Sequence, residues 1–312
     1  MNAKAYPHLN DLAQAAILLP VPERSKWTCR DRFIVHEQIS AIFKIVRMLV
    51  CSEGRVRARG LIVSGVGGSG KTMIANAILR EYPELGSTDE EEASQRVVRI
   101  TMTNAREASK IFSRTLRAMG CPNIASYSHD EREELVVELL KAANTRLLII
   151  DEIQDLLKRS DAQRENAFEG IKFLMNEASV NVLALGTDRA EMTMMREEHL
   201  VTRFRSLKLA KWRVGPLLAN FLDELESSLP LPERSRLSLP ATQRLLVKES
   251  KGRLDLIVER VVFAAALAIE NGVDRVDMGY LERSATEIPE YFAGRVPDKK
   301  SPREAAPQGI AA

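Results

Sequence analysis

The sequence predicts an α/β fold, in which a parallel β-sheet lies between helices, joined to a small all-helical domain. Up to about residue 215, short aliphatic stretches alternate with helical ones, which is the pattern of a parallel sheet with helical crossovers. From about Pro216 onward the strand signal stops and only helical periodicity continues. The chain has 312 residues, enough for one large domain or two modest ones with a sizeable core.

The expected elements of the α/β domain, residues 31–215, follow in chain order. Residues 1–30 precede it as an N-terminal extension with one helical segment. Residues 31–50 carry apolar side chains at helical spacing and predict its first helix. Four short, largely aliphatic stretches predict strands at residues 60–64, 97–102, 146–150 and 180–185. A helical stretch follows each of them, so we expect the strands to be parallel.

The helical domain is predicted to span residues 216–290. Apolar periodicity predicts its helices at residues 216–227, 241–249, 252–271 and 277–286. Pro216 suits the first turn of a helix, and Gly272 suits a C-terminal stop. Residues 291–312 have little to bury and are expected to be disordered.

Composition excludes several classes of protein. A hydrophobic fraction of 45% with 28% charged residues indicates a soluble globular chain. The net charge is only +2, so any surface for nucleic acid must be local. Cys29, Cys51 and Cys121 match no zinc spacing and suit a reducing cytoplasm. No apolar run reaches membrane-spanning length, and no signal peptide is visible, so we expect no contact with a membrane.

The most specific motif follows the first predicted strand. It fits the phosphate-binding pattern G-x-x-x-x-G-K-[ST] and consists of Gly65, Val66, Gly67, Gly68, Ser69, Gly70, Lys71 and Thr72. Glycines let backbone N–H groups turn toward phosphate oxygens. Lys71 would neutralise the β- and γ-phosphates of a nucleotide, and the Thr72 hydroxyl would bind Mg²⁺. An ordinary strand–helix connection is the alternative, but the strand before and the helix after favour a phosphate loop.

Two carboxylates, Asp151 and Glu152, follow the third predicted strand. Open α/β sheets bind ligands at the carboxyl ends of their strands. Asp151 would hold Mg²⁺ through water, and Glu152 would act as the general base that deprotonates the attacking water. Many strands end in acidic residues, but together with the phosphate loop the pair indicates one shared nucleotide site.

Three further residues are candidates for the same chemistry. Thr187 follows the fourth predicted strand and could position the attacking water, although it could also simply start a turn. Arg203, expected at the end of a helix, could reach the γ-phosphate of a neighbouring copy as an arginine finger; the alternative is a surface arginine. Arg253 opens a helix of the second domain and could couple the angle of that domain to the phosphate state.

A basic stripe follows the second predicted strand. Asn104 and Glu107 read as a capping box that opens a helix, and Gly120 reads as its stop. One face of this helix, opposite an apolar face, carries Arg106, Lys110, Arg114 and Arg117. Such a stripe fits the phosphate backbone of DNA, and the alternative is a solvated amphipathic helix. No base-reading motif is visible, so any DNA contact should follow backbone and shape.

Together these motifs resemble AAA+ ATPases, and among them the transposition ATPases of the TniB/TnsC type, relatives of the phage Mu B protein and IstB. The resemblance covers about residues 30–285. Its specific part is the run 200–239, in which Thr202-Arg203-Phe204 leads to Trp212. One departure is Gln154, where the family often has His.

The resemblance implies a P-loop NTPase domain of the AAA+ type, with its parallel sheet between helices, and a small helical lid. It implies ATP and Mg²⁺ as cofactors and hydrolysis of ATP to ADP and phosphate. It assigns Lys71, Thr72, Asp151 and Glu152 to the ATP site. Arg203 then corresponds to the finger acting in trans, and Thr187 and Arg253 correspond to the two sensors.

The resemblance also implies a homo-oligomer, either a ring or a filament, that assembles on double-stranded DNA with ATP in the cytoplasm of a bacterium, at the nucleoid. This oligomer would recruit or activate a transposase, and hydrolysis would disassemble it; a target-selecting protein is a further candidate partner. A helicase-loader-type AAA+ ATPase would share the ATP site, but the run 200–239 argues against it. A signalling NTPase without DNA is less favoured, because such proteins usually carry sensor repeats that this chain lacks.

Overall fold

The computed structural model describes residues 6–52, 57–83, 95–105, 107, 109–157 and 160–284. The chain divides into two compact units. The sheet unit consists of Arg32–Phe221 and Gln243–Leu256. The helical unit takes its described residues from Met1–Asp31, Leu222–Thr242 and Ile257–Ala312. Nothing in the sequence indicated that the N-terminal segment would group with the helical segments near the other end of the chain.

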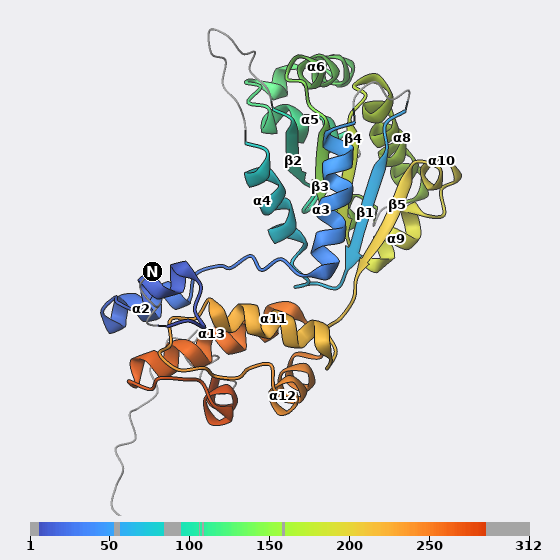
Figure 1. Cartoon of the computed structure of the whole chain (residues 1–312). Coiled ribbons are helices and arrows are strands. Elements are labelled where there is room, and N and C mark those ends of the chain that lie inside the picture. Colours follow the sequence, from blue (N-terminus) through green and yellow to red (C-terminus); the bar gives the residue numbers. More distant parts are fainter. Residues whose placement is uncertain are drawn as a thin grey trace, which may run out of the picture. The chain divides into compact units, whose positions relative to one another are not determined.

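The sheet unit is built on a five-stranded parallel sheet with the strand order β2-β3-β4-β1-β5 (Figure 1). The strands are β1 Gly60–Gly65, β2 Val97–Thr101, β3 Leu147–Asp151, β4 Asn181–Gly186 and β5 Phe204–Leu209. The first four confirm the predicted strands, with ends shifted by one residue or less, which is within the normal uncertainty of strand ends. The fifth strand, β5, was not predicted.

Helices cover both faces of the sheet. Up to residue 215 the helices of this unit are α3 Glu37–Val50, α4 Lys71–Glu81, α5 Lys110–Ala118, α6 His129–Ala142, α7 Gln154–Leu157, α8 Asp161–Glu177, α9 Asp188–Met194 and α10 Glu198–Val201, with a 3₁₀ turn at Ile124–Ser126. Successive side chains of β1 point to opposite faces. Leu61 therefore packs in the core beneath α3 and α4, whereas Ile62 packs in the core beneath α5, α6 and α8. Figure 1 shows α3 and α4 on one face of this sheet.

Helices also form where helical periodicity predicted them after residue 215. They are α11 Pro216–Ser227, α12 Pro240–Ser250 and α13 Leu254–Glu270, and residues 278–284 are helical as well. The predicted helix end at residue 286 and the tail 291–312 lie outside the described residues. No helix in the described part of the chain has the length and hydropathy needed to cross a membrane.

Two short helices of the N-terminal segment, α1 Asp11–Ala16 and α2 Val21–Thr28, belong to the helical unit. The N–H of Asn10 donates to the carbonyl of Ser227 (2.9 Å). The hydroxyl of Ser25 donates to the carboxylate of Glu270 (2.7 Å). These hydrogen bonds connect the N-terminal segment to the ends of α11 and α13 within the helical unit.

The helix predicted to carry the basic stripe starts later than expected. The capping box predicted at Asn104 and Glu107 is wrong, because α5 begins at Lys110 after Ser109. Asn104 instead has φ +57°, in the left-handed region that asparagine tolerates, and its N–H donates to Asp155 Oδ2 (3.0 Å). The predicted stop is confirmed, since Gly120 follows the helix with φ +76°.

Candidate functional site

The predicted phosphate loop, residues 65–72, connects β1 to α4 as its motif requires. Gly68 and Gly70 have φ values of +73° and +88°, which favour glycine because it has no Cβ. Gly70 is the N-cap of α4. The first N–H groups of a helix have no partner within the helix and form a positive end, so the amino end of α4 suits an anion.

Lys71 is buried within this loop. Its ammonium donates to the carbonyls of Gly65 and Val66 (2.9 Å each) and to Ser69 Oγ (3.1 Å). Burial lowers the pKa of Lys71, and nearby carboxylates, Glu152 first among them, oppose that shift. The ammonium is therefore partly desolvated and held by oxygens of its own loop, from which it can turn toward an anionic ligand.

Asp151 ends β3 beside the start of α4. Its side chain is only 1% exposed. Asp151 Oδ2 accepts a hydrogen bond from Thr72 Oγ1 (3.1 Å), so the two predicted metal-binding groups are in contact. A hydroxyl and a carboxylate are hard oxygen donors of the kind Mg²⁺ prefers. The same Oδ2 also pairs with the guanidinium of Arg99 on β2 (2.7 Å), a residue that the motifs did not include.

Glu152 has an uncommon backbone conformation, with φ +57°. Its carboxylate accepts a short hydrogen bond from Nε2 of Gln154, which is buried. Gln154 is the position at which the sequence departs from the family pattern. The glutamine that replaces the family's usual histidine is therefore in direct contact with the predicted general base.

Thr187 follows β4 and caps α9, where its Oγ1 accepts from the N–H of Ala190 (3.4 Å). Because β1, β3 and β4 are parallel and adjacent, the residues that follow them share one edge of the sheet. The structure thus brings Thr187 to the edge that carries the phosphate loop, Asp151 and Glu152.

Arg253 takes part in an ion pair near the phosphate loop. Its guanidinium pairs with the carboxylate of Asp255 (2.6 Å), and its side chain is half-exposed. Asp255 itself contacts the loop, since its N–H donates to the carbonyl of Gly68 (3.0 Å). A Cβ added to Gly68 would lie 2.0 Å from Asp255 Oδ2, so the approach is close.

Arg203 lies at the opposite end of the strands, at the edge of the sheet formed by their amino ends. Its carbonyl accepts from the N–H of Gly60, the first residue of β1, at 3.0 Å. Its guanidinium donates to Asn176 Oδ1 (2.7 Å). The six residues of β1 separate it from the phosphate loop by about 20 Å, given the rise of a strand. Arg203 and Lys71 therefore do not meet within one copy of the chain.

Two of the basic residues of α5, Lys110 and Arg114, have polar partners among the described residues. Lys110 lies 3.8 Å from the carboxylate of Glu107. The guanidinium of Arg114 donates to the carbonyls of Thr101 and Thr103, the latter at 3.0 Å, and so caps the end of β2. Arg117 is exposed. Arg106, the fourth member of the predicted stripe, lies outside the described residues.

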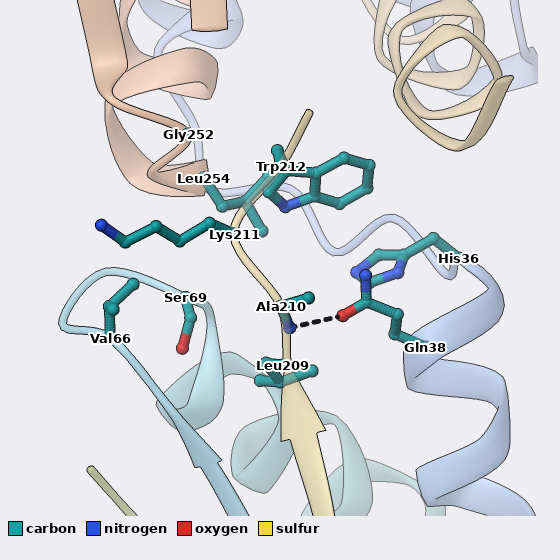
Figure 2. A pocket seen from close by; sticks show the side chains of 10 residues that line it. All are labelled: His36, Gln38, Val66, Ser69, Leu209, Ala210, Lys211, Trp212, Gly252 and Leu254. Atoms are coloured by element: carbon teal, nitrogen blue, oxygen red, sulfur yellow. Dashed lines mark hydrogen bonds between the residues drawn. The ribbon is translucent and has the colours of Figure 1, made fainter. Parts of the chain in front are cut away.

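A pocket beside the phosphate loop was not anticipated from the sequence (Figure 2). It is lined by His36, Gln38, Val66, Ser69, Leu209, Ala210, Lys211, Trp212, Gly252 and Leu254. Gln38 Oε1 accepts from the N–H of Ala210 (3.1 Å), as the dashed line in Figure 2 shows. The rings of His36 and Trp212 meet edge to face, with centroids 5.0 Å apart.

Burial lowers the pKa of His36 to about 4, so its imidazole is neutral at physiological pH. Its Nδ1 is buried without a hydrogen-bond partner among the described residues. The cavity holds only about 10 Å³, which is room for about one water molecule, so a flat ring would enter it only if the surrounding side chains moved apart. The sequence signal for this pocket was weak, because the contributing residues are far apart in the chain.

The strand order, the phosphate-loop sequence after β1 and the Asp-Glu pair after β3 define the class of AAA+ ATPases. The model of the bacterial TniB protein family matches residues 24–214, which is more than half of the chain, and the protein belongs to this family. A comparison with curated proteins gave no match. The predicted fold class and the family resemblance are thereby confirmed.

Solved structures share this fold at low sequence identity. The ORC2 protein of Aeropyrum pernix in ADPNP–ADP complexes is 17% identical, with 84% of this chain and 71% of that chain covered and a TM-score of 0.61. The ORC1 protein of Aeropyrum pernix in complex with DNA is 15% identical, with 85% and 69% covered and a TM-score of 0.58. Cdc6p from Pyrobaculum aerophilum is 15% identical, with 87% and 69% covered and a TM-score of 0.55. At these identities the likeness concerns the fold alone.

Proposed function

We propose that this protein binds ATP with Mg²⁺ at the carboxyl edge of the sheet and hydrolyses it to ADP and phosphate. The observation that carries the proposal is that the phosphate loop, Asp151 and Glu152 meet at one edge, with Thr72 and Asp151 in contact at 3.1 Å. Membership in the TniB family and the fold shared with ORC2, whose structure contains ADPNP and ADP, support a nucleotide as the ligand.

Each residue has a part in this reaction. The Lys71 ammonium would leave the loop carbonyls and bind the β- and γ-phosphates. Thr72 would hold Mg²⁺, with Asp151 acting through water, and the bound ion would neutralise charge that develops on the phosphates. Glu152 would take the proton of the attacking water, while Thr187 would orient that water. In the proposed ATP-bound state Arg253 would leave Asp255 for the phosphates.

We infer that the adenine base binds at the pocket in Figure 2, whose cavity of about 10 Å³ must widen by movement of the lining side chains to admit it. The pocket adjoins the phosphate loop through Val66 and Ser69, so a base there is within reach of phosphates on the loop. A neutral His36 can accept or donate a hydrogen bond to the edge of a base without the cost of a buried charge. Trp212 adds an aromatic wall.

The proposed site is completed by a second copy of the chain. Arg203 lies about 20 Å from its own phosphate loop, so as an arginine finger it would act on the nucleotide of a neighbour. Repeated head-to-tail contacts of this kind build a ring or a filament. ATP binding would therefore stabilise a homo-oligomer.

The role proposed for this oligomer is the regulation of DNA transposition. It would assemble on double-stranded DNA at the bacterial nucleoid, recruit or activate a transposase, receive a target-selecting protein, and disassemble on hydrolysis. TniB family membership supports this role, and a protein of the same fold, ORC1, has been solved with DNA. The proposed DNA contact on α5 rests on Lys110, Arg114 and Arg117.

Electron microscopy and sedimentation of the full chain with a non-hydrolysable ATP analogue, with and without duplex DNA, test the proposal. We expect oligomers on DNA only when the analogue is present. The Lys71→Ala variant should lose both nucleotide binding and assembly, because the phosphates lose their cation. A protein that stayed monomeric with analogue and duplex both saturating would overturn the proposed function.

A further inference from the structure

The guanidinium of Arg99 pairs with the carboxylate of Asp151, which the proposed function assigns to Mg²⁺ binding. Nη2 of Arg99 is 2.7 Å from Asp151 Oδ2, and the exposed fractions of the two side chains are 20% and 1%. Water screens a buried pair weakly, so the two charges attract each other strongly. Arg99 stands in an otherwise uncharged strand, Val-Val-Arg-Ile-Thr, where a charged side chain needs a partner.

Both oxygens of Asp151 have partners. Oδ2 accepts from Arg99 and from Thr72 Oγ1 (3.1 Å). Oδ1 accepts from the N–H of Glu152 (3.0 Å). A divalent cation, or its bound water, needs a carboxylate with negative charge to spare. Arg99 therefore competes with Mg²⁺ for the same oxygen of the same side chain.

A second hydrogen bond, to a residue of α4, also fixes the position of the Arg99 guanidinium. Its Nη1 donates a short hydrogen bond to Asn76 Oδ1, and Asn76 lies on α4, the helix that begins with Lys71 and Thr72. In the sheet register Thr101 is opposite Asp151 and Arg99 is opposite Ile149, so the guanidinium reaches along β3 to the carboxylate. The network joins β2, β3 and the helix after the phosphate loop.

We propose that Arg99 is a positioning residue that makes metal binding depend on nucleotide. In the nucleotide-free protein it balances the charge of Asp151 and keeps free divalent ions off the site. A triphosphate brings its own negative charge and oxygen ligands, so Mg²⁺ binds only together with the nucleotide. The inference deepens the proposed function and rests on Asp151 belonging to its metal site.

The test measures metal binding to the full-length, nucleotide-free chain, with Mn²⁺ as the probe and its electron paramagnetic resonance signal as the readout. The wild-type protein should bind no Mn²⁺ at Asp151. Arg99→Gln should bind Mn²⁺ with a dissociation constant at least about tenfold below the highest Mn²⁺ concentration at which the wild type shows no binding, because it removes a unit charge at hydrogen-bond distance from the carboxylate. Arg99→Lys keeps the charge and should behave like the wild type.

Two further measurements separate a metal effect from a structural one. Asp151→Asn in the Arg99→Gln background should abolish the gained Mn²⁺ binding. Thermal melts should also be recorded, since an unpaired buried carboxylate costs stability. If Arg99 were purely structural, Arg99→Gln would have a lower melting temperature and, like the wild type, would bind no Mn²⁺ at Asp151, and that result would overturn the inference.

The wild-type protein alone can also overturn it, even if Arg99→Gln does not fold. Mn²⁺ bound to the nucleotide-free wild-type chain, and lost in Asp151→Asn, would show that Arg99 does not keep metal off. None of these measurements contains nucleotide, so they are independent of the ATP-binding assay. A failure to bind ATP would refute the proposed function without deciding the part of Arg99.

Discussion

The backbone conformation of Glu152 is uncommon, and hydrogen bonds of the surrounding turn keep it in place. A φ of +57° is unfavourable for a side chain with a Cβ, by about 1–3 kcal/mol, and persists only where the surroundings hold it. Here the N–H of Asp155 donates to the Glu152 carbonyl (3.0 Å) and the N–H of Ile153 donates to the carbonyl of Leu185 (3.1 Å). The turn after β3 is therefore fixed on both sides, and Gln154 holds the carboxylate.

The Glu152→Gln variant tests the proposed general base. It should bind ATP as the wild type does but release phosphate about 100-fold more slowly or worse, the usual contribution of a general base. Nucleotide titration and phosphate release measure the two quantities. Glu165→Gln, a change of an exposed glutamate on α8, is the matched control and should leave both unchanged. Normal turnover in Glu152→Gln would reject Glu152 as the base.

His36 makes stability depend on pH in a defined direction. Its pKa is about 4 in the folded protein, below its ordinary value of 6.5, so the unfolded chain takes up the proton first as pH falls. The contribution of neutral His36 is complete above pH 6.5 and is lost as pH falls from 6.5 toward 4. Denaturant midpoints between pH 7 and 5 should fall less in His36→Phe than in the wild type. Equal slopes in both proteins would contradict this prediction.

Among the elements, the phosphate loop and the first turn of α13 form a close contact. Asp255 donates its N–H to the carbonyl of Gly68 and holds Arg253 with its carboxylate (2.6 Å). Gly68 has φ +73° and turns its Cα toward that carboxylate. Glycine at this position is thus required twice, once by its backbone conformation and once by space.

The Gly68→Ala variant should separate these two requirements. The left-handed backbone alone costs about 1–2 kcal/mol, and the contact with Asp255 adds to it. In a double-mutant cycle, Gly68→Ala should cost less in the Asp255→Ala background, because only the backbone term remains. Denaturant unfolding of the nucleotide-free protein measures both values.

Gly67→Ala is the control for that cycle. A Cβ there would meet no atom within 4 Å, and the φ of Gly67 lies outside the left-handed range. Its free energy of unfolding should stay close to that of the wild type. The prediction would be wrong if Gly68→Ala proved as stable as Gly67→Ala.

The sequence predicted the strands that consist mainly of aliphatic residues and missed the strand in which apolar and charged residues are mixed. Strands β1 to β4 are aliphatic runs buried along most of their length, so composition alone located them. The edge strand β5 buries only Phe204 and Leu209 and exposes Arg205 and Lys208. Charged side chains are common on edge strands, and they hid this strand from a reading of hydrophobicity.

In the candidate site, too, the sequence predicted some parts and missed others. The phosphate loop and the Asp-Glu pair are contiguous motifs, and the sequence showed them directly. The contact of Arg99 with Asp151 spans 52 residues, and it depends on the strand register. The pocket joins His36 to Trp212 across still more of the chain. Only folding brings such residues together, so no local pattern could have predicted these contacts.

At the scale of the whole molecule, the two edges of the sheet carry complementary parts of the proposed ATPase. The phosphate loop and Glu152 lie at the carboxyl edge, and Arg203 lies at the amino edge. Two copies joined carboxyl edge to amino edge would complete one site and leave one of each part free. Such a contact does not close on itself in a pair, so it favours an extended array or a ring over a symmetric dimer.

Mixing two inactive variants tests this arrangement. Arg203→Ala should bind ATP yet hydrolyse it poorly, because arginine fingers are worth about 10³–10⁵ in rate. Glu152→Gln should also hydrolyse ATP more slowly, by about 100-fold or more. In an equal mixture, roughly a quarter of head-to-tail contacts would pair an intact Glu152 with an intact Arg203, so phosphate release should reach up to about that fraction of the wild-type rate.

A mixture of Glu152→Gln with the double variant Glu152→Gln/Arg203→Ala contains no complete site and serves as the control. It should remain inactive at every ratio. Recovery in the first mixture but not in this control requires that Arg203 serve a nucleotide bound by another copy, since neither variant can supply both groups alone. Wild-type turnover by Arg203→Ala alone would instead mean that the 20 Å between the edges, estimated from the strand rise, separates two groups that do not act together.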